Sequence, residues 1–139
     1  METGAAFLAQ SREYLSEHYL PKLLEAVSRV DDATLWWRPN EASNSIGNLL
    51  LHLSGNLRQW LVSGVGGAPD HRERQAEFAE RKPLPRRELL ERFTATIREA
   101  DAALGRLPVS DLGAHRSIQG RDVFSGDQGE SRASIKMRV

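Results

Sequence analysis

Three long segments of this chain place apolar residues at three- and four-residue steps, and this helical period constrains the fold more than any other feature. The first segment covers about residues 4–30, the second about 45–62 and the third about 86–107. Pro21 lies inside the first and predicts a kink, because proline lacks a backbone donor and clashes with the preceding turn. Since we find no β-type alternation worth assigning to a strand, the pattern predicts an all-α fold.

The second segment carries two stripes when its residues are stepped by 100° each. The apolar stripe contains Ile46, Leu49, Leu50, Leu53, Leu57, Trp60 and Leu61. Gly55 lies within it, which predicts the close approach of a neighbouring backbone. The narrower polar stripe contains Ser45, Asn48, His52, Asn56 and Gln59. The polar stripe is either a rim beside the packed face or the wall of a site.

Between the second and third segments, the stretch "HRERQAEFAERKPLP" predicts a short exposed helix that ends at Pro83 and Pro85. Its arginines and glutamates offer pairs at helical spacing, each worth about 0.2–0.5 kcal/mol. A solvated face explains these charges.

The composition excludes several classes of protein. At 139 residues with 40% hydrophobic and 27% charged residues, the chain suits one soluble domain. Nineteen basic residues balance nineteen acidic ones, which argues against nucleic-acid binding. There is no cysteine, so disulfides, thiolate metal sites and cysteine nucleophiles are excluded. With no signal-peptide pattern and no apolar run of membrane-spanning length, we expect a cytoplasmic protein without membrane contact.

The last part of the chain differs from the rest. Residues 113–139 contain four glycines and few large apolar residues, so the sequence predicts a helical domain over residues 1–112 and an irregular or disordered tail over 113–139. Three long amphipathic helices usually need a fourth to cover them. We therefore expect the fourth helix to be missing or replaced by the tail. A premature end, a frameshift or a degenerate copy would each explain this.

The stretches "WWRPNEASNSIGNLLLHLSGNLRQWL", "SGVGGAPDHRERQAEFAER" and "HRSIQG" resemble the DinB-like superfamily, in order and over roughly residues 4–122. The resemblance implies an up-down-down-up four-helix bundle, often a homodimer. It also implies a metal site of three histidines, one on the second helix and two in an H-x-x-x-H on the fourth.

His52 matches the second-helix histidine, which makes it the expected ligand of a divalent metal such as zinc or nickel. No histidine follows His115, so two of the three implied ligands are missing. Asn48 and Asn56 lie one turn on either side of His52. They either hydrogen-bond around the site or satisfy the backbone of a neighbouring loop.

Two functions remain open at the level of the sequence. One is a metal-dependent thiol S-transferase with an incomplete site, which acts on a small thiol as some relatives do. The other is a non-catalytic helical dimerisation module, or an inactive truncated remnant. Whether the chain is an enzyme is not decided by its residues.

Overall fold

The computed structural model describes residues 2–119 and 121–123, and three long helical rods dominate it. The first rod consists of α1 (Thr3–Glu13), the π-helical segment η1 (Tyr14–Tyr19) and α2 (Leu20–Ser28). The second consists of α4 (Ile46–Leu57) and the π-helical segment η2 (Arg58–Val65), and the third is α6 (Arg86–Arg106). The all-α prediction and its three long helices are confirmed.

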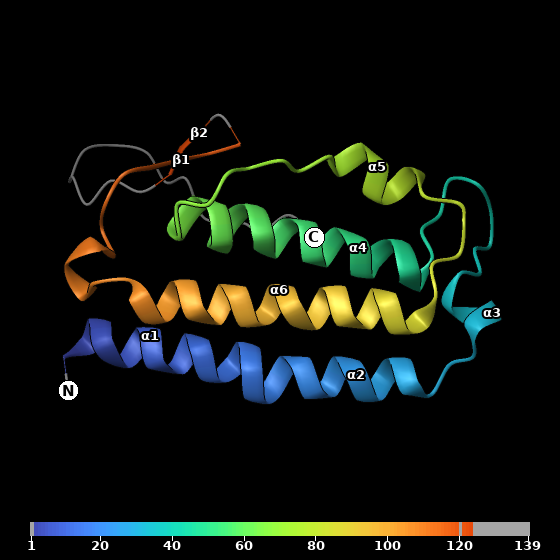
Figure 1. Ribbon diagram of the computed structural model, residues 1–139, viewed down its shortest axis with the longest axis horizontal. Helices are drawn as coiled ribbons and strands as arrows, with labels where there is room; N and C mark the ends of the chain where they lie inside the picture. The colour runs from blue at the N-terminus through green and yellow to red at the C-terminus, as the bar shows by residue number, and fades with distance from the viewer. Residues whose placement is uncertain (1, 120, 124–139) are drawn as a thin grey trace.

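The three rods lie side by side, with α6 between the first rod and α4 (Figure 1). The colours of Figure 1 show that α4 and α6 run in the same direction, opposite to the first rod. This is the up-down-down order of the expected bundle. The predicted loss of the fourth helix concerns residues that lie mostly outside the described part of the chain.

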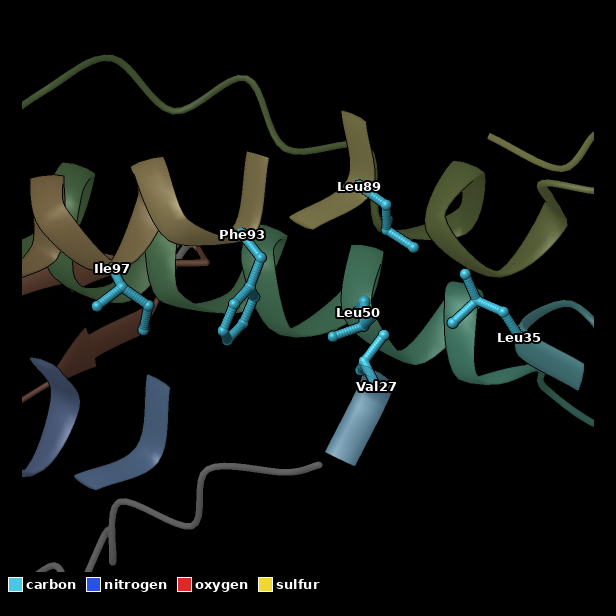
Figure 2. Packing of buried hydrophobic residues seen from close by; sticks show 6 residues of the cluster. All are labelled: Val27, Leu35, Leu50, Leu89, Phe93 and Ile97. Carbon is cyan, nitrogen blue, oxygen red and sulfur yellow. The ribbon is translucent and has the colours of Figure 1, made fainter. Parts of the chain in front are cut away.

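A compact apolar cluster holds the rods together. It consists of Val27, Leu35, Leu50, Leu89, Phe93 and Ile97, which come from α2, the short helix α3 (Asp32–Leu35), α4 and α6 (Figure 2). Leu50 of α4 lies next to Val27 of α2 in this view. Burial of each large aliphatic side chain stabilises the fold by about 1.5–3 kcal/mol.

The first rod stays helical through Pro21, where the sequence predicts a kink. The π-helical turn over Tyr14–Tyr19 comes immediately before α2, and Pro21 stands in the first turn of α2. A π-turn shifts the hydrogen-bond register by one residue, so it accommodates the missing donor and the bulky ring of the proline. The effect of Pro21 on the rod is therefore a local widening of the helix at the π-helical turn.

The connection between α4 and α6 has to return along the length of α4, because the two helices are parallel. It carries the short helix α5 (Arg74–Ala79), which packs on α4. The predicted short helix is confirmed, but the prediction that its charges form a solvated face is wrong for two residues. The side chains of Arg72 and Glu77 are only 4% and 11% exposed. The return path presses them against the polar stripe.

The described end of the chain forms a turn of 3₁₀ helix, η3 (Val109–Asp111), and two short antiparallel strands, β1 (Arg116–Ile118) and β2 (Arg121–Val123). Our expectation of no strand is wrong here, because three-residue strands carry no detectable alternation. Ile118 is buried against Gly64 at the end of η2. The domain boundary at residues 112 and 113 stays a prediction.

Candidate functional site

The polar stripe of α4 faces inward and meets the returning connection. Asn48, His52, Gln59, Arg72 and Glu77, here called the His52 cluster, join α4 and η2 to α5 and the loop before it. Asn48 and His52 are 0% and 2% exposed. The stripe is therefore buried and hydrogen-bonded to the returning connection, and the prediction that it forms the wall of a site stays a prediction.

Asn48 fastens α5 onto the start of α4. Its side-chain Oδ1 accepts hydrogen bonds from the backbone N–H and the hydroxyl of Ser45. In return, Ser45 Oγ accepts from the backbone N–H of Asn48 at 3.0 Å, which completes a capping box. Asn48 Nδ2 donates to the backbone carbonyls of Glu77 and Glu80, each at 3.0 Å. The interpretation that an asparagine satisfies a neighbouring backbone is therefore confirmed for Asn48.

The structure does not bring Asn56 into the His52 cluster. Its side chain is half-buried, and it makes no hydrogen bond to any described residue. Its expected role beside a metal stays a prediction.

His52 is held on one side of its ring only. Its Nδ1 lies 3.1 Å from Nη2 of Arg72 and 3.3 Å from Oε1 of Glu77. The ring packs against Phe78, with the centroids 4.7 Å apart and the planes tilted by 32°. The other ring nitrogen, Nε2, is buried and has no hydrogen-bond partner among the described residues. A buried polar atom without a hydrogen-bond partner costs about 1–3 kcal/mol, so Nε2 is the unsatisfied atom of this imidazole.

Arg72 and Glu77 form a buried ion pair with two parallel hydrogen bonds. Arg72 Nε donates to Glu77 Oε2 at 3.0 Å, and Arg72 Nη2 donates to Glu77 Oε1 at 2.9 Å. Such bidentate pairs fix geometry as well as charge. Arg72 Nη1 also donates to Gln59 Oε1 at 2.9 Å. The guanidinium is thereby anchored by two elements.

Gln59 connects the buried guanidinium of Arg72 to Asp70 at the surface. Its amide donates to Asp70 Oδ2 at 2.8 Å. This hydrogen bond, followed by one from the Arg72 backbone, lowers the pKa of Asp70. The carboxylate of Asp70 is thus favoured over its protonated form at the outer end of the network.

Gly55 leaves the space that the ion pair occupies. A Cβ added to Gly55 would lie 1.8 Å from Glu77 Oε2 and 3.1 Å from Arg72 Nε. The sequence predicts the approach of a backbone at this glycine, but the structure places a carboxylate there. The prediction was right about close approach and wrong about the approaching group.

A cleft of about 450 Å³ opens beside the cluster. Arg72, Glu77 and Gly55 line it, together with Arg92 of α6 and residues of the loop after η2. His52 does not line this cleft, so the ion pair lies between the cleft and the imidazole.

The described residues fit one position of a metal site. Nε2 of His52 has no partner among the described residues, and the Glu77 carboxylate lies near the other ring nitrogen, as is common behind metal-bound histidines. The guanidinium of Arg72 lies nearer to that nitrogen, at 3.1 Å. Within residues 2–119 and 121–123, however, no three His, Asp or Glu side chains gather closely enough to hold a metal. Catalytic zinc commonly takes three protein ligands, so His52 supplies only part of a site.

The remaining histidines, and Trp36 and Trp37, make no hydrogen bond to the His52 cluster among the described residues, although His71 lines the same cleft. His71 and His115 are exposed, and His18 pairs with Glu13 on the surface at 3.3 Å. Trp36 packs on Gly47 and donates to the Leu84 carbonyl at 3.3 Å, near the start of α4. Trp37, by contrast, is 65% exposed, so only the first of the two tryptophans covers the end of the bundle.

A family model described as the DinB superfamily matches residues 14–126. This chain belongs to the DinB superfamily. The matched range includes every residue of the His52 cluster, so the cluster is part of the superfamily domain. Searches of curated proteins and of solved structures gave no match to this DinB-superfamily chain. None of the helices in its described part has the length and apolarity to cross a membrane.

Proposed function

We propose that this DinB-superfamily protein binds a divalent metal through Nε2 of His52. The observation that carries the proposal is a buried imidazole with one nitrogen held and the other without a partner. Zinc and nickel both accept imidazole nitrogen, so they are the metals we favour. The remaining ligands would come from outside the described residues or from a second copy of the chain in a homodimer.

The proposed reaction is the transfer of a small thiol to an electrophile. When bound, a metal of this kind stabilises the thiolate form of a thiol at neutral pH. The chain's own residues have separate tasks. Asn48 holds α5 in place, Arg72 and Glu77 orient the imidazole, and Phe78 covers its face.

The second candidate is a non-catalytic dimerisation module. It is favoured by the aromatic side chains that the first rod leaves exposed: Phe7 at 61%, Tyr14 at 45% and Tyr19 at 61%. Large exposed apolar groups often mark an interaction surface. In this case the His52 cluster would serve only as a polar part of the core.

Metal content of the purified protein separates the two candidates. We expect about one zinc or nickel per chain, because one buried imidazole offers one ligand position. The metal should be lost in His52→Ala and kept in His18→Ala, which removes an exposed histidine of the first rod. Plasma mass spectrometry gives the stoichiometry, and a thiol-transfer assay with and without chelator tests for the reaction.

Equal metal content in the two variants, or none in the unmodified protein, would contradict the metal proposal. The dimerisation module would then stand as the better account.

A further inference from the structure

The two neighbours of His52 Nδ1 make opposite demands on the imidazole. A guanidinium only donates hydrogen bonds, so Arg72 requires a bare Nδ1. A carboxylate only accepts them, so Glu77 requires Nδ1–H. A neutral imidazole carries one proton on one of its two nitrogens. The neighbour with which Nδ1 forms its hydrogen bond therefore decides whether the unpartnered Nε2 carries a proton or presents a lone pair.

The geometry favours Arg72. Its Nη2 lies 3.1 Å from Nδ1, whereas Oε1 of Glu77 lies 3.3 Å away. Glu77 Oε1 already accepts a hydrogen bond from Arg72 at 2.9 Å. Arg72 cannot turn from the imidazole without disturbing its bonds to Glu77 and Gln59.

We propose that Arg72 is a positioning residue that holds His52 as the Nε2–H tautomer in the metal-free protein, and that Glu77 opposes it. With Arg72 in place, the buried nitrogen presents an N–H group, which suits an acceptor such as a carbonyl or carboxylate oxygen. A cation needs the lone pair of Nε2 instead. A bound cation would require Nε2 to have released its proton to water and Nδ1 to have taken one up from water, with Glu77 Oε1 as the acceptor of the Nδ1–H.

Arg72 and Glu77 thus act in opposite senses on the class of ligand. Arg72 disfavours a cation at Nε2, and Glu77 favours one. Both residues line the 450 Å³ cleft, so a molecule in that cleft reaches the pair that controls the imidazole. The part of this inference that concerns cations rests on the proposed function, and the part that concerns the tautomer does not.

Nitrogen NMR of the histidine side chains tests the tautomer directly. We expect metal-free protein, at a pH of about 8 where an ordinary imidazole is neutral, to show His52 with Nδ1 bare and Nε2 protonated. Arg72→Met should move the proton to Nδ1, and Glu77→Gln should leave it on Nε2. The spectrum of His52→Ala identifies the signals.

The matched control is the exposed pair on α6. Arg87 and Glu91 lie 2.8 Å apart, with side chains 89% and 64% exposed, so Arg87→Met and Glu91→Gln should change nothing at His52. Circular dichroism checks that each variant is folded. A proton on Nδ1 in the unmodified protein would overturn the proposal, as would loss of the Nε2 proton in Glu77→Gln, which stays informative if Arg72→Met does not fold.

Titration with zinc alone tests the opposed effects. Arg72→Met should bind zinc about tenfold more tightly than the unmodified protein, and Glu77→Gln about tenfold more weakly, the scale expected for groups behind a metal ligand. A change of the same sign in both variants would refute the opposition. Absence of zinc binding throughout would refute both the cation part and the proposed function, while the NMR result still decides the tautomer.

Discussion

Gly55 shows how one residue sets the distance between α4 and a buried charge. In most helix interiors, glycine to alanine stabilises by about 0.5–1 kcal/mol. At Gly55 the added Cβ would meet Glu77 Oε2 at 1.8 Å and displace a pair whose arginine is 4% exposed. We therefore expect Gly55→Ala to lower the free energy of unfolding by about 1–2 kcal/mol, since displaced buried polar groups cost about 1–3 kcal/mol.

Urea unfolding measures this difference, and Gly105→Ala is its matched control. The new Cβ at Gly105 of α6 would meet the guanidinium of Arg12, which pairs with Asp101 and has a side chain that is 44% exposed. This side chain can move aside in solvent, so the control should be neutral or stabilising. Equal stabilisation by both substitutions would show that the Arg72–Glu77 pair does not depend on the glycine.

Part of the site was predictable at the scale of single residues. The 100° spacing placed Asn48 and His52 on one stripe, and both are buried. The spacing did not reveal Arg72 and Glu77, because their burial depends on the path of a loop rather than on the period of their own helix. The signal that was available is Phe78, an aromatic residue inside a highly charged stretch, which marks a face turned toward the protein.

The six residues of α5 depend on their contact with α4. A helix this short is unstable alone, because nucleation is costly. Asn48→Ala removes two donors to the carbonyls of Glu77 and Glu80 and breaks the capping box of α4. We expect the amides of α5 to exchange with solvent at least tenfold faster, which corresponds to a loss of 1.4 kcal/mol or more in local stability.

Hydrogen exchange read by mass spectrometry resolves this element from the others. Peptides from the middle of α6 serve as the internal reference, because their burial does not involve Asn48. If α5 and α6 lose protection to the same extent, Asn48 supports the whole fold rather than the docking of α5.

Among the elements, the long helices and the short helix α5 were predictable, but the π-helical turn and the two strands were not. The apolar period gave α4 and α6 to within a few residues, since helix bounds follow a repeated pattern over many turns. The π-helical turn before Pro21 and the strands β1 and β2 involve a few residues each. Their formation depends on contacts with other elements, which a local pattern does not encode.

At the scale of the whole molecule, surface ion pairs connect the rods and make stability depend on pH. Arg58 donates to Glu99 at 2.8 and 3.0 Å, linking η2 to α6. This hydrogen bond lowers the pKa of Glu99, as the Gln59 amide lowers the pKa of Asp70. A carboxyl with a lowered pKa in the folded state stabilises the fold above its unfolded pKa, and this contribution is lost as the pH falls through the folded pKa.

We expect the free energy of unfolding to decline below a pH of about 4, where these two carboxyl groups take up protons. Urea titrations between about pH 2.5 and 7 measure the profile. Asp70→Asn and Glu99→Gln should each flatten it, because the variants cannot titrate at these positions. Profiles that match the unmodified protein would show that neither group contributes to the acid transition.

The arrangement of the rods explains how a distant loop completes the site. Because α4 and α6 are parallel, the chain between them must return along α4, and this path brings Arg72 and Glu77 to His52 (Figure 1). The helical period predicted the long helices, and the resemblance to the DinB-like superfamily implied their bundle, but neither specified the return path. The site is therefore a property of the whole topology as well as of the α4 stripe.

Anomalous X-ray scattering from crystals grown with zinc would test our proposal that Nε2 of His52 binds a metal. We expect an anomalous peak about 2.0–2.1 Å from Nε2, absent in crystals of His52→Ala. An anomalous map with no peak at His52, whether or not zinc is found at other positions in the crystal, would contradict the metal proposal.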